Sequence, residues 1–226
     1  MPVVSFANPK GGAGKTTSAL VLAGELADRG AKVVIIDADP EKWISGWGDL
    51  PNKPENIVIV SNVSEDTIVD QIETAQSQAQ FVIVDLEGTA SLMVANAIGM
   101  SDLVIVPVQG SSMDAKGGAK TLRLIQNQSR MTRRQIPASV VFTRTSAAVM
   151  SRSLRNVKEQ LSDAGISVFS TPIVERAAFR DLFDFGGLLS ELDPKNVSNI
   201  QKAQANAQEF AGEVLAKLKQ AQAEVV

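Results

Sequence analysis

The sequence predicts an α/β fold, in which a mostly parallel, twisted sheet of about seven strands carries helices on both faces. Short β-branched runs alternate along the chain with longer helical stretches, the pattern of repeated strand–helix–strand units. Several of these runs, such as 33–37 and 81–85, are apolar at every position until they end in an acidic residue. Strands that are apolar on both faces belong in the centre of a sheet, between two helical layers.

Seven segments are the expected strands, and a terminal helix is expected at about 199–222. The strands are expected at Val3–Ala7, Lys32–Asp37, Ile57–Ser61, Phe81–Asp85, Leu103–Val108, Ala138–Phe142 and near Val168. With 226 residues, 44% of them hydrophobic, the chain can bury a full-sized core. It contains no internal repeat, linker or low-complexity segment, so we expect residues 1–226 to form a single domain.

The composition excludes several classes of chemistry. Cysteine, histidine and tyrosine are absent, which excludes disulfides, thiolate metal sites, iron–sulfur clusters and cysteine or histidine catalysis. No charged-then-apolar leader opens the chain, and no apolar run approaches the roughly 20 residues of a membrane-spanning helix, so we expect a cytoplasmic protein. The net charge of -3 gives no global attraction to nucleic acid, and such binding requires a local basic patch.

A glycine-rich loop, "NPKGGAGKTT" at residues 8–17, follows the first expected strand. It fits the phosphate-binding pattern G-x-x-x-x-G-K-[ST], except that Pro9 or Lys10 stands where the first glycine belongs. Its three glycines allow a tight turn whose N–H groups face phosphate oxygens, and the following helix adds its positive dipole end. Lys15 can reach the β and γ phosphates, and the Thr16 hydroxyl can bind Mg²⁺. The loop therefore predicts a nucleoside triphosphate site.

Lys10 is the residue that this general pattern does not explain. Beside Lys15 it would suffer like-charge repulsion unless extra negative charge lies nearby, and a bound triphosphate supplies that charge. The stretch "KGGAGKTT" resembles the deviant Walker A motif of the ParA/MinD family of ATPases. That resemblance implies that Lys10 reaches across a dimer interface to the partner's nucleotide, so that an ATP-bound homodimer forms and Lys10 and Lys15 act in catalysis. The loop residues implied to bind ATP are Gly11, Gly12, Ala13, Gly14, Lys15, Thr16 and Thr17.

Acidic residues end two of the expected strands. Ligands of open parallel sheets bind beyond the carboxyl ends of the strands, so Asp37, Asp39 and Asp85 should converge on the loop. Carboxylates at such positions hold Mg²⁺ or orient an attacking water. We assign Asp39 to the attacking water, and Asp37 and Asp85, with Thr16, to the Mg²⁺ site; a strand-end or N-cap role is the alternative for each.

The segments "VVIIDADP" and "FVIVDLEG" resemble the two acidic strand ends of the family. The family often has Thr-Pro-Pro after the second of these aspartates, whereas Leu86-Glu87-Gly88 follows here. This sequence resembles the Asp-x-Glu-Gly variant of small plasmid and conjugative members, and the role of Glu87 stays open.

Two later segments resemble the family's adenine pocket. "VVFTRTSA" at 140–147 stands where the family usually carries an Asn-Arg pair, and "STPIVERAAFRDL" at 170–182 resembles the segment whose backbone lies against the base. The resemblance implies adenine contacts from Thr143, Arg144 and Pro172. Pro172 could equally serve only to shape a turn.

A basic stretch stands out in an otherwise acidic chain. Asp and Glu are nearly absent between Lys120 and Glu159, where several arginines gather. These arginines form either a solvated face or a surface for nonspecific binding of DNA phosphates, completed in the dimer. The expected DNA contacts are Arg130, Arg133, Arg134, Arg152 and Arg155.

Three functions compete on this sequence. The first is a ParA-type partition or positioning ATPase, cytoplasmic and nucleoid-associated, whose hydrolysis is slow and stimulated by a small DNA-binding or adaptor partner; the resemblance includes the VirC-type members of conjugative plasmids. The second is a MinD-like membrane-cycling ATPase, but "GEVLAKLKQAQAEVV" has too thin an apolar face for stable membrane binding. The third is a metabolic P-loop enzyme of the dethiobiotin-synthetase type, which Lys10 argues against.

Overall fold

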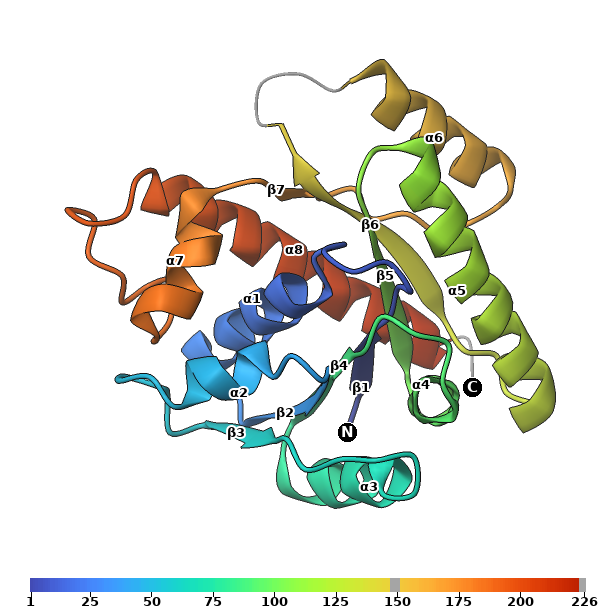
Figure 1. Cartoon of the computed structure of the whole chain (residues 1–226), viewed down its shortest axis with the longest axis horizontal. Helices are drawn as coiled ribbons and strands as arrows, with labels where there is room; N and C mark the ends of the chain where they lie inside the picture. Colours follow the sequence, from blue (N-terminus) through green and yellow to red (C-terminus); the bar gives the residue numbers. More distant parts are fainter. Residues whose placement is uncertain (147–150, 224–226) are drawn as a thin grey trace.

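The computed structural model describes residues 1–146 and 151–223, without the side chains of 112–115, and its centre is one seven-stranded sheet (Figure 1). The strands follow the order β3-β2-β4-β1-β5-β6-β7, and every neighbouring pair is parallel. They are β1 (Val3–Phe6), β2 (Val33–Ala38), β3 (Ile57–Val60), β4 (Phe81–Leu86), β5 (Leu103–Val108), β6 (Ala138–Thr145) and β7 (Ile173–Val174). The predicted α/β fold with a parallel sheet is confirmed.

Helices cover both faces of the sheet, and each face has its own hydrophobic core (Figure 1). One core holds side chains from α1 (Lys15–Asp28), α2 (Trp43–Gly48), α7 (Ala177–Phe185) and α8 (Ile200–Ala223). The other holds side chains from α3 (Ile68–Gln78), α4 (Leu92–Gly99), α5 (Ser112–Thr132) and α6 (Arg152–Asp163). Alternate residues of β2 enter opposite cores: Val33 and Ile35 face one, and Val34 and Ile36 face the other. The continuous apolar runs therefore mark central strands, as predicted.

The seventh strand differs from its predicted position. Val168 forms only an isolated bridge to Val140, and the strand itself is Ile173–Val174. Between them, the Glu213 carboxylate of α8 accepts hydrogen bonds from the backbone N–H groups of Ser170 and Thr171, at 2.7 and 2.9 Å. Because these N–H groups donate to a side chain, they do not donate to β6. Strand pairing with β6 begins two residues later, at Ile173.

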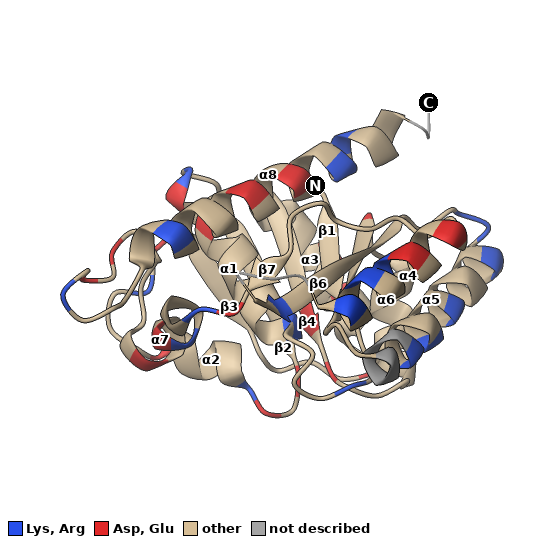
Figure 2. Ribbon diagram, turned by 90° about the horizontal axis from the view of Figure 1, so that it is seen from above, with Lys and Arg blue, Asp and Glu red and all other residues tan. Residues whose placement is uncertain are grey.

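The sheet order decides where the site forms. β4 lies between β1 and β2, with Asp85 opposite both Phe6 and Asp37, so three adjacent strands end at one edge (Figure 2 looks onto the molecule from above). The glycine-rich loop at 8–17 follows β1 at that same edge. The convergence of Asp37, Asp85 and the loop is thus a consequence of strand order.

Membrane insertion has no candidate among the helices of the described residues. None of these helices combines the length and the apolar character needed to cross a bilayer.

Candidate functional site

The loop between β1 and α1 has the conformation that phosphate binding requires. Gly12 and Gly14 have φ values of 75° and 94°, a left-handed conformation that disfavours residues with side chains. Gly14 is also the N-cap of α1, where no side chain caps the helix, and Lys15 begins the helix with its side chain buried. The N–H groups of the first helical turn therefore lack a side-chain cap, at the helix end where the dipole attracts anions.

Asn8 fixes the start of the loop, and the sequence analysis assigned it no role. Its side chain is 2% exposed; Nδ2 donates to the Pro107 carbonyl at 2.6 Å, and Oδ1 accepts from the Lys10 backbone N–H at 2.9 Å. One amide group thereby ties the end of β1 to β5 and sets the backbone direction at Lys10.

Two further side chains hold the carbonyls of the loop. Gln109 Nε2 donates to the Gly12 carbonyl at 2.8 Å, and the buried Thr143 hydroxyl donates to the Ala13 carbonyl at 2.7 Å. Because side chains from two other segments of the chain donate to these carbonyls, they hold the backbone on the N-terminal side of Gly14 in place. The sequence analysis also assigned no role to Gln109; its position directly after a fully apolar strand marks a polar residue but does not indicate the carbonyl that it binds.

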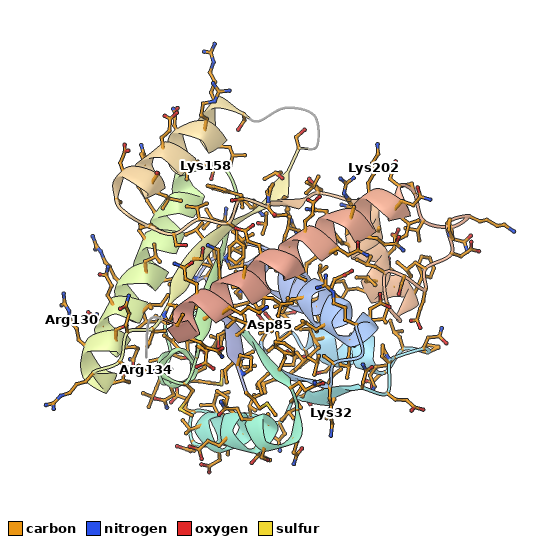
Figure 3. All side chains as sticks on the ribbon, turned by 180° about the vertical axis from the view of Figure 1, so that it is seen from behind. Lys32, Asp85, Arg130, Arg134, Lys158 and Lys202 are labelled. Atoms are coloured by element: carbon orange, nitrogen blue, oxygen red, sulfur yellow. The ribbon has the colours of Figure 1, made fainter. Side chains whose placement is uncertain are left out.

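Two carboxylates lie buried beside the loop. Asp37 and Asp85 are both 0% exposed (Figure 3 labels Asp85 deep inside the molecule). The Ser45 N–H and hydroxyl donate to Asp37 Oδ2. Within the described residues, Asp37 Oδ1 and both oxygens of Asp85 form no hydrogen bond. Burial raises the pKa of Asp85 to about 7, against the lowering effects of the Thr16 hydroxyl and the Lys15 ammonium.

Three unpartnered, buried carboxylate oxygens are costly unless a cation joins them. The described residues contain no group of three or more Asp, Glu, His or Cys that could hold a metal alone. Mg²⁺ in proteins commonly uses one or two carboxylates together with phosphate oxygens and water. The donor set of Asp37, Asp85 and Thr16 therefore fits a Mg²⁺ ion that arrives with a nucleotide.

Asp39 lies at the same edge but in a different environment. It is partly exposed, and its Oδ1 accepts from the Glu41 backbone N–H at 3.0 Å. The neighbouring Lys42 ammonium donates to the carbonyls of Asp37 and Ser61, at 2.6 and 2.9 Å, which fastens this turn to β2 and β3. Asp39 is accessible to water, as its predicted role requires, and that role stays a prediction.

A cavity of about 250 Å³ opens beside the first turn of α1. Its lining residues are Gly14, Thr17, Ser18, Thr143, Arg144, Ile173, Val174, Glu175, Arg176, Phe179 and Arg180. Within the described part of the chain, the Arg176 Nε is buried without a hydrogen-bond partner. Thr143 and Arg144 thus lie where a base could bind.

Pro172, which we expected to contact adenine, does not line this cavity. Its carbonyl accepts from Asn206 Nδ2 of α8 at 2.8 Å, and Asn206 Oδ1 accepts from the Val174 N–H at 3.0 Å. The carbonyl of Pro172 is thus committed to α8, and the following residues 173–176 take its place beside the cavity.

The expected DNA contacts divide into two groups. Arg130 and Arg133 are exposed at the end of α5, near the amino-terminal edge of the sheet. Arg152 and Arg155 are exposed on the first turns of α6, where Ser153 donates to the Gly110 carbonyl beyond the carboxyl end of β5. Figure 2 shows basic segments along α5 and α6 on one side of the molecule, so the two groups share a side but lie toward opposite ends of it.

Arg134 differs from the other four because its side chain has partners within the protein. Its Nη2 donates to the carbonyls of Gly99 and Ser101 at 3.1 and 2.6 Å, and its Nη1 lies 3.4 Å from Asp102 Oδ1. Figure 3 shows Arg134 and Arg130 near the end of α5. The guanidinium of Arg134 joins the end of α4 to α5, while the side chain stays 42% exposed; a structural role is thus the alternative to its DNA contact, which stays a prediction.

Arg130 belongs to a regular row of four cations on α5, the other three of which were not among the expected DNA contacts. All four side chains are exposed and share one helix face, because their spacings are close to whole numbers of turns. The row consists of Lys116, Lys120, Arg123 and Arg130. The 4-, 3- and 7-residue spacing was readable from the sequence once the helix bounds were known.

Comparison with known proteins identifies relatives over nearly the whole chain. The family model described as VirC1 protein matches residues 1–223. Protein ParA of Rhizobium radiobacter is 41% identical, covering 98% of this chain and 99% of its own length. The maintenance of carboxysome distribution protein A of Halothiobacillus neapolitanus is 28% identical, covering 79% of this chain and 82% of its own length.

Solved structures confirm the fold independently. A Cyanothece McdA variant in complex with ATP superposes with a TM-score of 0.73 at 18% identity, covering 99% of this chain and 96% of that one. The MinD cell division protein of Aquifex aeolicus superposes with a TM-score of 0.70 at 16% identity, covering 96% and 98%. Given the full-length family match and the 41% identical relative, this chain belongs to the VirC1 family of ParA-type P-loop ATPases.

Proposed function

We propose that this protein is a partition ATPase that binds ATP and Mg²⁺, dimerises in the ATP-bound state, and then binds DNA without regard to sequence. ATP hydrolysis, slow alone and stimulated by a small DNA-binding or adaptor partner, returns it to the monomer. The 41% identity to a ParA protein favours a DNA cargo over the carboxysome cargo named for the 28% identical relative. We place the protein in the cytoplasm, associated with the nucleoid.

One observation carries the nucleotide part of the proposal: Asp37 and Asp85 are buried side by side next to a lysine-bearing loop, and three of their oxygens have no partner among the described residues. Lys15 and the N–H groups of the loop would bind the phosphates, while Thr16 and the two aspartates would hold Mg²⁺. Bound Mg²⁺ supplies charge neutralisation of the phosphates. Asp39, on the accessible side, would orient the attacking water.

Dimerisation rests on Lys10 and on the family. The Lys10 backbone is fixed by Asn8, and Gly117 of α5 lies so close that an added Cβ would come within 3.1 Å of Asn8 Oδ1 and 3.9 Å of Lys10 Cβ. Lys10 is thus anchored at the start of α5. A second copy facing this edge would bring its own Lys10 to the nucleotide of the first.

The DNA part rests on the exposed cations of α5 and α6. The row on α5 runs from Lys116 to Arg130, about 21 Å along the helix, so it can follow several phosphates of one DNA strand. Contacts of this kind neutralise phosphates and do not read bases. A dimer doubles the number of contacts, which explains why we expect binding to depend on ATP.

Two alternatives have less support than partition. A membrane-cycling role needs a free apolar helix face, but the apolar side chains of α8, such as Phe210, Val214 and Leu218, are buried in the core. A metabolic role is suggested by the fold alone: a Mycobacterium smegmatis cobyrinic acid a,c-diamide synthase superposes with a TM-score of 0.71 at 18% identity.

Gel-shift titrations test the proposal, with a duplex of arbitrary sequence, at several salt concentrations, and with ATP, ADP or no nucleotide. We expect binding only with ATP, with log affinity falling linearly with log salt by about 0.9 per phosphate neutralised. Lys15→Ala should bind no DNA. Failure of the ATP-bound protein to bind DNA would remove DNA from the mechanism, and equal binding with ADP would remove the nucleotide switch.

A further inference from the structure

Lys42 directly follows the short segment that carries Asp39, between β2 and α2. Its backbone has a φ of 52° and a ψ of 36°, the left-handed conformation that favours glycine. A residue with a side chain persists there only where the surrounding structure holds it. The Lys42 ammonium supplies such contacts, because Nζ donates to the carbonyls of Asp37 and Ser61 at 2.6 and 2.9 Å. The lysine side chain thus has a task at this position that glycine could not perform.

Asp39 begins a tight turn that Lys42 ends. The Lys42 N–H donates to the Asp39 carbonyl at 3.1 Å, and the Glu41 N–H donates to Asp39 Oδ1 at 3.0 Å. Aspartate at the first position of the turn and Pro40 at the second are typical of this geometry. These two hydrogen bonds set the shape of the turn, but they do not place it relative to the sheet.

Two side chains place the turn relative to the sheet, and both reach Asp37. Lys42 binds the carbonyl of Asp37 in β2 and that of Ser61, just beyond β3. Farther along, the Ser45 N–H and hydroxyl donate to Asp37 Oδ2. Lys42 is half-buried and, within the described residues, pairs with no carboxylate. Its ammonium therefore acts on the backbone that ends β2 and β3, and through that backbone on the position of Asp39.

We propose that Lys42 is a positioning residue for ATP hydrolysis, which holds the Asp39 carboxylate where it can orient the attacking water. This inference rests on the proposed function, since it requires that Asp39 orients that water. A displacement of about 1 Å in a positioned group can cost on the order of 10²-fold in rate. An interaction that matters only in the transition state lowers kcat and leaves substrate binding almost unchanged. Lys42 acts through Asp39, so its loss should change kcat and not the affinity for ATP.

Lys53 offers a matched control, because its ammonium also donates to two carbonyls at an end of β3. Its Nζ donates to the carbonyls of Pro54 and Ile57 at 3.2 and 2.8 Å, at the end of the strand away from Asp39. Both lysines are half-buried. Lys42→Met and Lys53→Met each keep the length of the side chain and remove only its ammonium, so a general loss of stability should affect both variants alike.

Two measurements on the full chain with Mg²⁺ test the proposal: kcat for phosphate release from ATP, and calorimetric affinity for a non-hydrolysable ATP analogue. We expect Lys42→Met to lower kcat by at least about tenfold while the analogue affinity stays within about threefold of the parent value. Lys53→Met should keep both quantities within about threefold. Lys42→Arg should recover most of the lost kcat, because a guanidinium also donates to carbonyls.

The outcomes separate the inference from the proposed function. If the parent hydrolyses no ATP, the proposed function is wrong. If the parent hydrolyses ATP and Lys42→Met has the same kcat, the inference is wrong and the proposed function stands. Equal losses of kcat in Lys42→Met and Lys53→Met, or a loss of analogue affinity as large as the loss of kcat, would also overturn the inference.

Hydrogen exchange without nucleotide tests the positioning itself and does not depend on activity. The Glu41 and Ser45 amides donate to the side chains of Asp39 and Asp37, and in Lys42→Met they should exchange at least about tenfold faster than in the parent. In Lys53→Met the same amides should exchange within about threefold of the parent rate. Unchanged exchange of both amides in Lys42→Met would overturn the inference.

Discussion

The Thr143 hydroxyl donates a 2.7 Å hydrogen bond to the carbonyl of Ala13, 130 residues earlier in the chain. The same side chain lies against Gly14, where an added Cβ would approach it to 3.2 Å. Thr143 therefore supports the phosphate-binding loop from β6, in addition to lining the cavity where we place the base.

Thr143→Val keeps the shape of this side chain and removes its hydrogen bond. We expect affinity for ADP to fall about five- to tenfold, since a lost buried hydrogen bond costs about 1 kcal/mol. Inorganic tripolyphosphate separates two roles in the same calorimetric experiment. Its affinity should fall in parallel if Thr143 supports the loop; a loss confined to ADP would mean that Thr143 acts only on the base. Thr143→Ser should retain most of the affinity.

Asp39→Ala should bind ATP and Mg²⁺ and accumulate as a dimer, because a water-orienting carboxylate acts on the chemical step more than on binding. Hydrolysis should fall on the order of 10²-fold. Phosphate release and sedimentation, measured on one preparation, check both halves. Normal turnover by this variant would assign the attacking water to another residue.

Arg134 and Arg130 lie near each other at the end of α5 but should behave differently in DNA binding. Arg130→Ala should reduce the slope of log DNA affinity against log salt concentration by about one unit per subunit, because it removes a phosphate contact. Arg134→Ala should leave the slope unchanged and lower the melting temperature, because it frees two carbonyls that it now binds. A flatter slope in Arg134→Ala, with an unchanged melting temperature, would show that Arg134 contacts DNA and has no structural role.

Glu25 predicts a pH dependence of stability. It lies on α1, 6% exposed, and burial raises its pKa from 4.5 to about 7, with Arg29 opposing and Asp28 reinforcing the shift. Because the folded-state pKa is the higher one, the stabilisation from this group is fully present below pH 4.5 and is lost as the pH rises through 7.

Glu25→Gln should accordingly be more stable than the parent at pH 8, with the difference shrinking below pH 5. Urea unfolding between pH 5 and pH 8 measures the difference in free energy of unfolding between variant and parent. Glu209→Gln, at an exposed position on α8, is the control. A Glu25→Gln curve parallel to that of the parent would show that burial does not perturb this carboxyl.

The features that the sequence predicted well are local ones. Each apolar run, and the glycine spacing at 11–14, lies within ten residues of the sequence. Once the strands are in their order in the sheet, the pairing of β2 with β4 places Asp37 opposite Asp85. The supports of the loop could not be found in this way, because Gln109 and Thr143 bind carbonyls 97 and 130 residues away. Nothing near either residue in the chain indicates that partner.

Partners distant in sequence overturned one prediction and gave another residue a second role. Charge made Arg134 a candidate DNA contact, and the structure adds that its guanidinium donates to carbonyls 33 and 35 residues earlier. Hydrophobicity alone made Val168 look like a strand, but a carboxylate in a later helix binds the backbone of Ser170 and Thr171. In both cases the partner lies far away in the sequence, where a local pattern cannot reveal it.

The central claim is that nucleotide state controls dimerisation through two lysines with separate tasks. Sedimentation velocity of the parent, Lys10→Ala and Lys15→Ala, each with ATP and with ADP, tests it most directly. We expect the parent to dimerise only with ATP, Lys15→Ala to bind no nucleotide, and Lys10→Ala to bind ATP yet remain a monomer. Dimerisation of Lys10→Ala to the same extent as the parent would contradict the account.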